Sequence, residues 1–197
     1  YGVANKKGKP DREAAMEILK TACQSGMDSF DTSAGYGESK ALIGEFIEHY
    51  RMHKNVKISS KMNYFSDKDH LKKDVMESIT RSLEKLRVEK IDYYLLHSPV
   101  HLFDFGERLV DMFLEQVRDK KIGKFGVSVY TPQDVEECLK YQEIKVVQVP
   151  FNILDQRLLR TGLLQRLKER NVEVHARSVY LQGVINMEPE DIPVSLR

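Results

Sequence analysis

The chain has 197 residues, with 31 Lys and Arg against 30 Asp and Glu, so its formal net charge is +1. This balance argues against a protein that binds nucleic acid or another polyanion, which would carry a basic excess. The hydrophobic fraction of 41% is typical of a globular protein. No apolar run approaches the roughly 20 residues that cross a bilayer, so we predict no membrane span.

Two cysteines, Cys23 and Cys138, stand far apart in the sequence. This pair excludes a disulfide framework and a zinc knuckle, and it favours a reducing, cytoplasmic location. Both cysteines fall in predicted helices and are expected to pack as small apolar side chains. Five histidines lack the spacing of metal ligands, so we predict no metal site and assign them to the surface or to packing: His49, His53, His70, His101 and His175.

Short β-branched or aromatic runs alternate with longer helical stretches along the chain. Up to residue 62 the pattern predicts a helix over 11–25, a strand over 27–33, a helix over 39–50 and a strand over 56–62. Gly26 is expected to end the first helix, and Ser39 to cap the second.

The same alternation continues to residue 180. Ser66 and Asp69 resemble a capping box that begins a long amphipathic helix with apolar positions through Leu86. The further elements expected are strands over 91–97, 124–130, 145–151 and 172–180, and helices over 108–121, 132–141 and 158–170, with Pro132 in a first helical turn. The tail over 182–197 predicts no regular element.

Unbroken alternation of strands and helices predicts a parallel sheet with right-handed crossovers. Two architectures fit this pattern: a (β/α)₈ barrel and an open, doubly wound sheet. A complete barrel has about 250 residues, so the six β/α units here fall two strands short of closure. No linker or domain boundary is visible, and residues 1–197 are expected to form one domain. The alternation alone leaves the architecture open.

Four polar side chains lie at or just beyond the ends of three successive predicted strands. Asp31 is near the end of the first strand and Tyr36 is in the turn that follows, while Lys61 and His97 end the next two strands. The carboxyl ends of parallel strands form the working face of β/α folds. Because neighbouring strands are about 4.8 Å apart, we expect the four groups within about 10 Å of one another.

The chemistry of these four groups is specific. A phenol has an ordinary pKa of about 10, and a lysine ammonium beside it lowers that pKa. Asp31 would keep Lys61 charged and oriented, and His97 would donate a hydrogen bond to a carbonyl oxygen. Tyr36 could then give that oxygen a proton as negative charge develops on it. No side chain supplies a hydride, so a nicotinamide cofactor is implied.

Five segments resemble the successive strand-end signatures of the aldo-keto reductase superfamily, in the family's order: FDTSAGYGESKALIGEFI, KISSKM, YYLLHSP, GVSVY and VVQVPFN. The resemblance implies a (β/α)₈ barrel that binds an extended nicotinamide cofactor, usually NADPH, and reduces aldehydes and ketones. It makes Tyr36 the general acid, Lys61 and Asp31 the pair that tunes it, and His97 the residue that orients the carbonyl.

The resemblance also assigns cofactor contacts and shows departures from the family pattern. Ser128 and Gln148 match positions that hold the nicotinamide carboxamide. Val129 stands where the family often has Asn, and Arg177 where many members stack a tyrosine on the nicotinamide ring. An arginine guanidinium can lie flat against that ring, or it can pair with an acid instead. The choice between NADPH and NADH, the substrate and the oligomeric state stay open.

Family members have a strand before the segment that begins this chain, and an eighth strand with cofactor contacts after the segment that ends it. We therefore expect an incomplete barrel that lacks the first strand and the C-terminal cofactor-binding part. The missing parts are either deleted or belong to a longer protein.

Two rival interpretations remain, and a third can be rejected. A non-catalytic family member could bind the nicotinamide cofactor as a sensor or partner subunit. An aldolase-type barrel could use Lys61 as a Schiff-base nucleophile, although Asp31 beside it argues against this. The segment Gly35-Tyr36-Gly37 resembles the start of a Rossmann fingerprint, but Lys40 occupies its third glycine position, so we reject that motif.

Overall fold

The computed structural model describes residues 5, 8–63 and 70–194. The described strands are β1 (Ser29–Asp31), β2 (Lys57–Met62), β3 (Ile91–Leu96), β4 (Ile122–Ser128), β5 (Val146–Pro150) and β6 (Glu173–Arg177). The helices are α1 (Arg12–Gln24), α2 (Ser39–His49), α3 (Leu71–Leu86), α4 (Val100–Arg118), α5 (Pro132–Cys138), α6 (Arg157–Arg160) and α7 (Leu163–Glu169). Two short 3₁₀ segments follow, η1 (Leu181–Asn186) and η2 (Pro189–Asp191).

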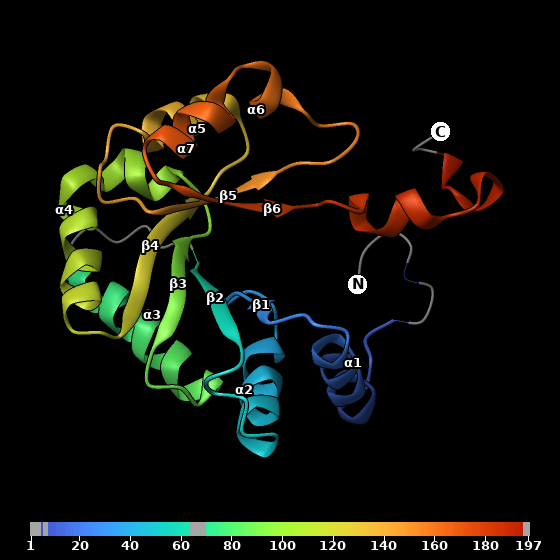
Figure 1. Cartoon of the computed structure of the whole chain (residues 1–197). Helices are drawn as coiled ribbons and strands as arrows, with labels where there is room; N and C mark the ends of the chain where they lie inside the picture. The colour runs from blue at the N-terminus through green and yellow to red at the C-terminus, as the bar shows by residue number, and fades with distance from the viewer. Residues whose placement is uncertain (1–4, 6–7, 64–69, 195–197) are drawn as a thin grey trace.

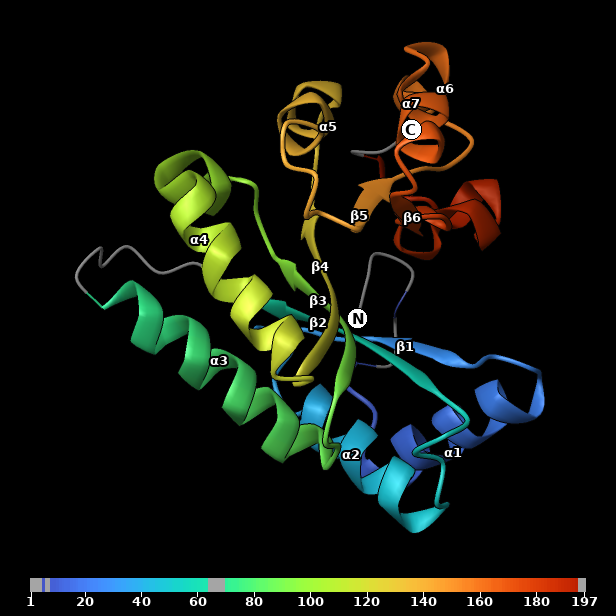
Figure 2. The same cartoon turned by 60° about the vertical axis from the view of Figure 1, so that its left-hand side comes forward.

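The described strands form one parallel sheet in the order β1-β2-β3-β4-β5-β6. The sheet curls, and helices cover its outer side (Figure 1). The turned view shows the strands fanning around a common axis, with α3 and α4 packed side by side outside them (Figure 2). Sequential order excludes a doubly wound sheet, in which the order reverses at a switch point. The fold is therefore a partial (β/α)₈ barrel, as predicted.

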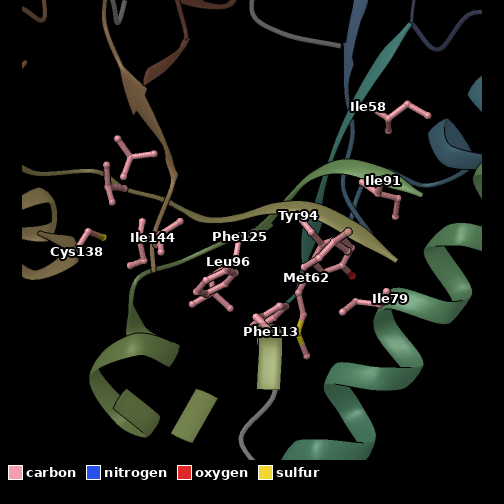
Figure 3. Close-up of a cluster of buried hydrophobic side chains, with 14 of the residues drawn as sticks. Ile58, Met62, Ile79, Ile91, Tyr94, Leu96, Phe113, Phe125, Cys138 and Ile144 are labelled. Atoms are coloured by element: carbon pink, nitrogen blue, oxygen red, sulfur yellow. The ribbon is translucent and has the colours of Figure 1, made fainter. Parts of the chain in front are cut away.

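Alternate residues of each strand face opposite sides of the curled sheet. Tyr94, Leu96 and Phe125 face the helices, where Phe113 of α4 stacks on Phe125 with ring centroids 4.3 Å apart. Figure 3 shows this cluster between the strands and the helices, with Ile79 reaching it from α3. Burial of each large apolar side chain contributes about 1.5–3 kcal/mol. This outer layer holds the strands in place and fixes which residues point into the barrel.

The helices α2 and α3 approach each other at a glycine. A Cβ atom on Gly44 would lie 2.3 Å from the carbonyl oxygen of Lys85 on α3. No side chain fits in that space, so only glycine allows the two backbones to come this close. The same approach packs Lys40, one turn earlier on α2, against α3, where its Nζ donates to Ser82 Oγ at 2.6 Å.

Two helices differ from the prediction. Helix α4 begins at Val100 rather than at 108, and it is kinked at Gly106, whose φ is 50° and ψ −135°. Gly106 interrupts the apolar pattern, but the buried side chains of His101 and Leu102 keep the first turns packed on the barrel. The helix predicted over 158–170 is wrong as one element, because Gly162 adopts a left-handed φ of 72° and divides it into α6 and α7.

The capping predictions have mixed outcomes. Gly26 follows the end of α1 with a φ of 87°, as a helix-ending glycine should. Ser39 does not cap α2: it is the first helical residue, and Thr32 lies against it with Oγ1 donating to Ser39 Oγ at 3.0 Å. The predicted pair Ser66 and Asp69 lies outside the described residues.

The remaining expectations concern the tail and the cysteines. Beyond β6 the tail, predicted to lack regular elements, contains η1 and η2. Cys138 is buried in the core and Cys23 packs on its edge, and both are free thiols. Within the described part of the chain, no helix is both long and apolar enough to cross a membrane.

Candidate active site

Asp31 and Lys61 form an ion pair at the mouth of the barrel. Lys61, the next-to-last residue of β2, points into the barrel. Its Nζ lies 2.5 Å from Asp31 Oδ2 and 3.2 Å from the carbonyl oxygen of Thr32. Lys61 is 0% exposed, whereas the Asp31 side chain is 41% exposed. Burial lowers the pKa of Lys61, and the nearby Asp31 carboxylate opposes this shift by favouring the ammonium form. The pair thus places a buried cation beside a partly exposed carboxylate at the mouth of the barrel.

Tyr36 lies directly beside this cation. The turn after β1 is closed by hydrogen bonds from Tyr36 N to Ser33 O (3.2 Å) and from Ser39 N to Tyr36 O (3.1 Å). Lys61 Nζ is 5.4 Å from the centroid of the Tyr36 ring. The ring is half-buried, so the aromatic side chain is held beside the ammonium and is still partly open to solvent.

His97 follows β3 and completes the group. Its backbone N–H donates to Met62 O at 3.1 Å, which continues the pairing of β2 with β3. Its ring centroid is 5.7 Å from that of Tyr36, with the two planes at 80°. Burial, followed by the charge on Lys61, lowers the pKa of His97, so the imidazole is neutral at pH 7. The structure therefore brings together all four residues expected at the strand ends.

Ser128 and Gln148 lie side by side at the ends of β4 and β5. They are register partners, and both side chains are almost fully buried on the inner face. Neither side chain has a hydrogen-bond partner among the described residues. A hydroxyl and an amide complement the N–H and C=O groups of a carboxamide, so this pair fits the nicotinamide group implied by the sequence.

Arg177, at the end of β6, contacts residues 129 and 130 just after β4. Its Nη2 donates to Val129 O at 3.0 Å, and its guanidinium lies 4.5 Å from the centroid of the Tyr130 ring. Its buried Nε has no partner within the described ranges. In this structure the Arg177 guanidinium lies over the Tyr130 ring, and its two expected roles, stacking on a cofactor ring or pairing with an acid, stay predictions.

Sequence reasoning missed two residues that contact His97. Ser33 Oγ lies 3.1 Å from His97 Nδ1, and Asn63 Oδ1 lies 3.4 Å from the same atom. Ser33 comes two positions after Asp31, and Asn63 two positions after Lys61. Side chains two apart in an extended chain share a face, so continuing each strand by one step would have found both.

A polar cluster that the sequence did not indicate lies inside the curled sheet, nearer to the starts of the strands than the site. Lys124 of β4 pairs with Glu173 of β6, and its Nζ lies 5.9 Å from the centroid of the Tyr93 ring. His175 packs on Tyr93 with ring centroids 4.6 Å apart. Of the two roles expected for this histidine, surface or packing, the structure shows packing. The Lys124 and Glu173 side chains are 43% and 39% exposed, so the cluster lines this part of the barrel without closing it.

The comparisons with known proteins agree on one family. The sequence profile of the Aldo/keto reductase family matches residues 1–193. Glyoxal reductase of Bacillus subtilis is 30% identical over 174 residues, which cover 86% of this chain and 59% of that protein. The NADH-specific methylglyoxal reductase of Escherichia coli is 24% identical over 196 residues, covering 90% of this chain and 60% of that protein.

A solved structure supports the same architecture. The aldo/keto reductase of Klebsiella pneumoniae, in complex with NADP and acetate, superposes with a TM-score of 0.74 at 20% identity, covering 90% of this chain and 62% of that one. At this level of identity the likeness shows the fold. The chain spans about three fifths of the length of these proteins.

Proposed function

Because the chain belongs to the aldo/keto reductase family, we propose that it acts as an NAD(P)H-dependent oxidoreductase that reduces aldehyde or ketone carbonyls to alcohols. The observation that carries the proposal is the convergence of Tyr36, the Asp31–Lys61 pair and His97 at one end of the barrel. A bound nicotinamide cofactor would supply the hydride, and Ser128 and Gln148 would hold its carboxamide.

Tyr36 is the proposed general acid. A carbonyl oxygen that gains negative charge needs a proton, and a partly exposed phenol can donate one. The Lys61 ammonium beside the ring stabilises the phenolate that remains. Asp31 holds that ammonium in place and keeps it charged, which opposes the effect of burial.

His97 is proposed to orient the substrate. A neutral imidazole can donate one hydrogen bond to the carbonyl oxygen, and its position next to Tyr36 directs that oxygen toward the phenol. The Asp31 carboxylate at Lys61 Nζ also disfavours a Schiff-base role for this lysine, because it keeps the proton on the amine.

The substrate class and the cofactor are also proposals. Two relatives are named as reductases of glyoxal and methylglyoxal, which supports small aldehydes as the first compounds to test. We favour NADPH from the family resemblance, although one of these relatives is NADH-specific. We also propose that the protein acts in the cytoplasm, since both of its cysteines are free thiols.

The test is the Tyr36→Phe variant in the whole protein. Turnover of glyoxal, methylglyoxal and a panel of other aldehydes is followed by oxidation of NADPH and, separately, of NADH. We expect turnover to fall about 10²–10⁴-fold, because a general acid contributes that factor. Binding of the nicotinamide cofactor, measured by fluorescence titration, should not change.

Tyr50→Phe is the matched control, since Tyr50 is an exposed tyrosine at the end of α2 and should tolerate loss of its hydroxyl. A Tyr36→Phe variant with the wild-type rate would show that the proton comes from another group. A wild-type protein that binds the cofactor but reduces none of the carbonyls would instead support a sensor or partner subunit.

A further inference from the structure

Ser33 is a buried hydroxyl between the catalytic turn and His97. It is 1% exposed, and its Oγ is 3.1 Å from His97 Nδ1. The backbone N–H of Gly35 also points at this oxygen, at 3.0 Å. Ser33 therefore connects the turn that carries Tyr36 to the ring that orients the substrate.

The direction of the Ser33–His97 hydrogen bond follows from counting protons. An N–H group can only donate, so Gly35 uses a lone pair of Ser33 Oγ. The hydroxyl proton then needs an acceptor, because a buried donor without a partner is destabilising. Among the described residues, the acceptor in hydrogen-bond range of Ser33 Oγ is His97 Nδ1, so we take the hydroxyl as the donor.

The protonation state of His97 then fixes its tautomer. Burial and the charge on Lys61 lower the pKa of His97, so the ring is neutral and carries one proton. If Nδ1 accepts from Ser33, that proton is on Nε2. Asn63 does not decide the tautomer, because its amide can turn by half a rotation and present either its oxygen or its nitrogen to Nδ1.

Glycine at position 35 supports this arrangement. A Cβ atom there would lie 3.3 Å from Asn63 Oδ1 and 3.6 Å from Ser33 Oγ. A side chain would therefore press on Asn63 and come into van der Waals contact with Ser33, the two residues that contact His97. The backbone of the turn, the serine and the imidazole form one hydrogen-bonded unit.

We propose that Ser33 is a positioning residue whose hydroxyl holds His97 in the neutral tautomer with its proton on Nε2. That tautomer can donate a hydrogen bond to a carbonyl oxygen, whereas the Nδ1-protonated form presents a lone pair and repels it. The catalytic consequence rests on the function proposed above, but the tautomer itself does not.

The first measurement is the tautomer of His97 in the wild-type protein. Long-range ¹H–¹⁵N correlation spectra at pH 7.5 show which ring nitrogen is protonated, and loss of the signals in His97→Gln assigns them. We expect the proton on Nε2. A wild-type spectrum with the proton on Nδ1 would overturn the proposal without any variant.

The second measurement compares three serine variants. In Ser33→Ala we expect the ¹⁵N shifts of His97 to move toward those of a mixture of tautomers, and kcat for an aldehyde to fall about tenfold with a smaller change in KM. Ser33→Thr keeps a hydroxyl and should restore both the spectrum and kcat. Ser60→Ala is the control, because Ser60 is buried with an unpaired hydroxyl in the described structure and does not contact His97.

The two proposals fail in different ways. If Ser33→Ala leaves the tautomer of His97 unchanged, the role of Ser33 is wrong, even in an active reductase. If the tautomer shifts as expected but the wild-type protein reduces no carbonyl, the tautomer assignment stands and the proposed reaction fails.

Discussion

Lys61 and Lys40 are equally buried but have different surroundings. Lys61 is 0% exposed at the barrel mouth and faces the carboxylate of Asp31. Lys40 is 4% exposed between α2 and α3, and its partner in the described structure is the neutral hydroxyl of Ser82. Two lysines in one small protein thus show what a buried cation does with and without a counterion.

The pKa values of the two lysines reflect this difference. Burial lowers both, but Asp31 opposes the shift at Lys61. At Lys40 the charges of Lys85 and Lys61 add to the effect of burial, and the pKa falls to about 8. Asp31 therefore favours the charged form of Lys61 at the barrel mouth. Lys40, in contrast, reduces stability at neutral pH because its charge is poorly compensated.

The largest expected effect is on catalysis and comes from Lys61→Met. Removing the ammonium beside Tyr36 should reduce kcat/KM for an aldehyde about 10²–10⁴-fold, since the phenolate loses its stabilising charge. Steady-state NADPH oxidation measures the effect. Lys40→Met is the matched control because it makes the same change at the other buried lysine, and it should keep kcat within about twofold. Equal losses in both variants would remove the functional distinction between the two lysines.

Asp31→Asn tests the counterion itself and makes Lys61 resemble Lys40. Without the carboxylate, the pKa of Lys61 falls further, so the ammonium is lost at a lower pH. We expect kcat/KM to drop about tenfold at pH 7, and the alkaline limb of the pH–rate profile to move toward lower pH. A profile with the wild-type alkaline limb would show that Asp31 does not control the charge of Lys61.

The smallest expected effect is on stability, and it comes from Lys40→Met. Replacing a buried, poorly compensated ammonium by an apolar side chain of similar length should raise the free energy of unfolding by about 1–3 kcal/mol at pH 7. Urea denaturation measures the difference. Lys73→Met on α3 is the control, because this exposed lysine should change stability by less than about 0.5 kcal/mol.

The difference in the free energy of unfolding between Lys40→Met and wild type should depend on pH in one direction. The pKa of Lys40 is about 8 in the folded protein, against 10.5 for an ordinary lysine in the unfolded chain. The folded state therefore binds the proton more weakly. The stability that wild type loses at neutral pH is regained as the pH rises through 8 toward 10.5. The gap between Lys40→Met and wild type should therefore narrow by about 2 kcal/mol between pH 7 and pH 9.5. A gap independent of pH would show that folding does not lower the pKa of Lys40.

The sequence predicted that the strand-end residues lie together, but it did not predict the burial of Lys40. Asp31, Lys61 and His97 follow from local signals, because alternation along a strand and the parallel order of strands place their ends together. The burial of Lys40 depends instead on how closely two helices approach, which is a tertiary property. Ser33 and Asn63 lie just past the strand ends. They were missed because the alternation of faces was not followed two residues beyond Asp31 and Lys61.

The helix boundaries show a similar division. Glycine correctly signalled the end of a helix at Gly26. The helix predicted over 108–121 is preceded by further helical turns, which are joined to it by a kink at Gly106. At Gly162 the apolar repeat suggested one helix, but the left-handed backbone divides it. Gly44, in contrast, stays helical inside α2, so a glycine allows a break without requiring one.

Gly44 determines more than the spacing of two helices. Any larger residue there would move α2 away from the carbonyl of Lys85 and let water reach the amine of Lys40, one turn earlier. The size of one side chain thus sets the hydration of another. Among homologous sequences, the two positions should co-vary: where position 44 enlarges, a lysine at position 40 becomes an ordinary hydrated cation and is no longer selected against.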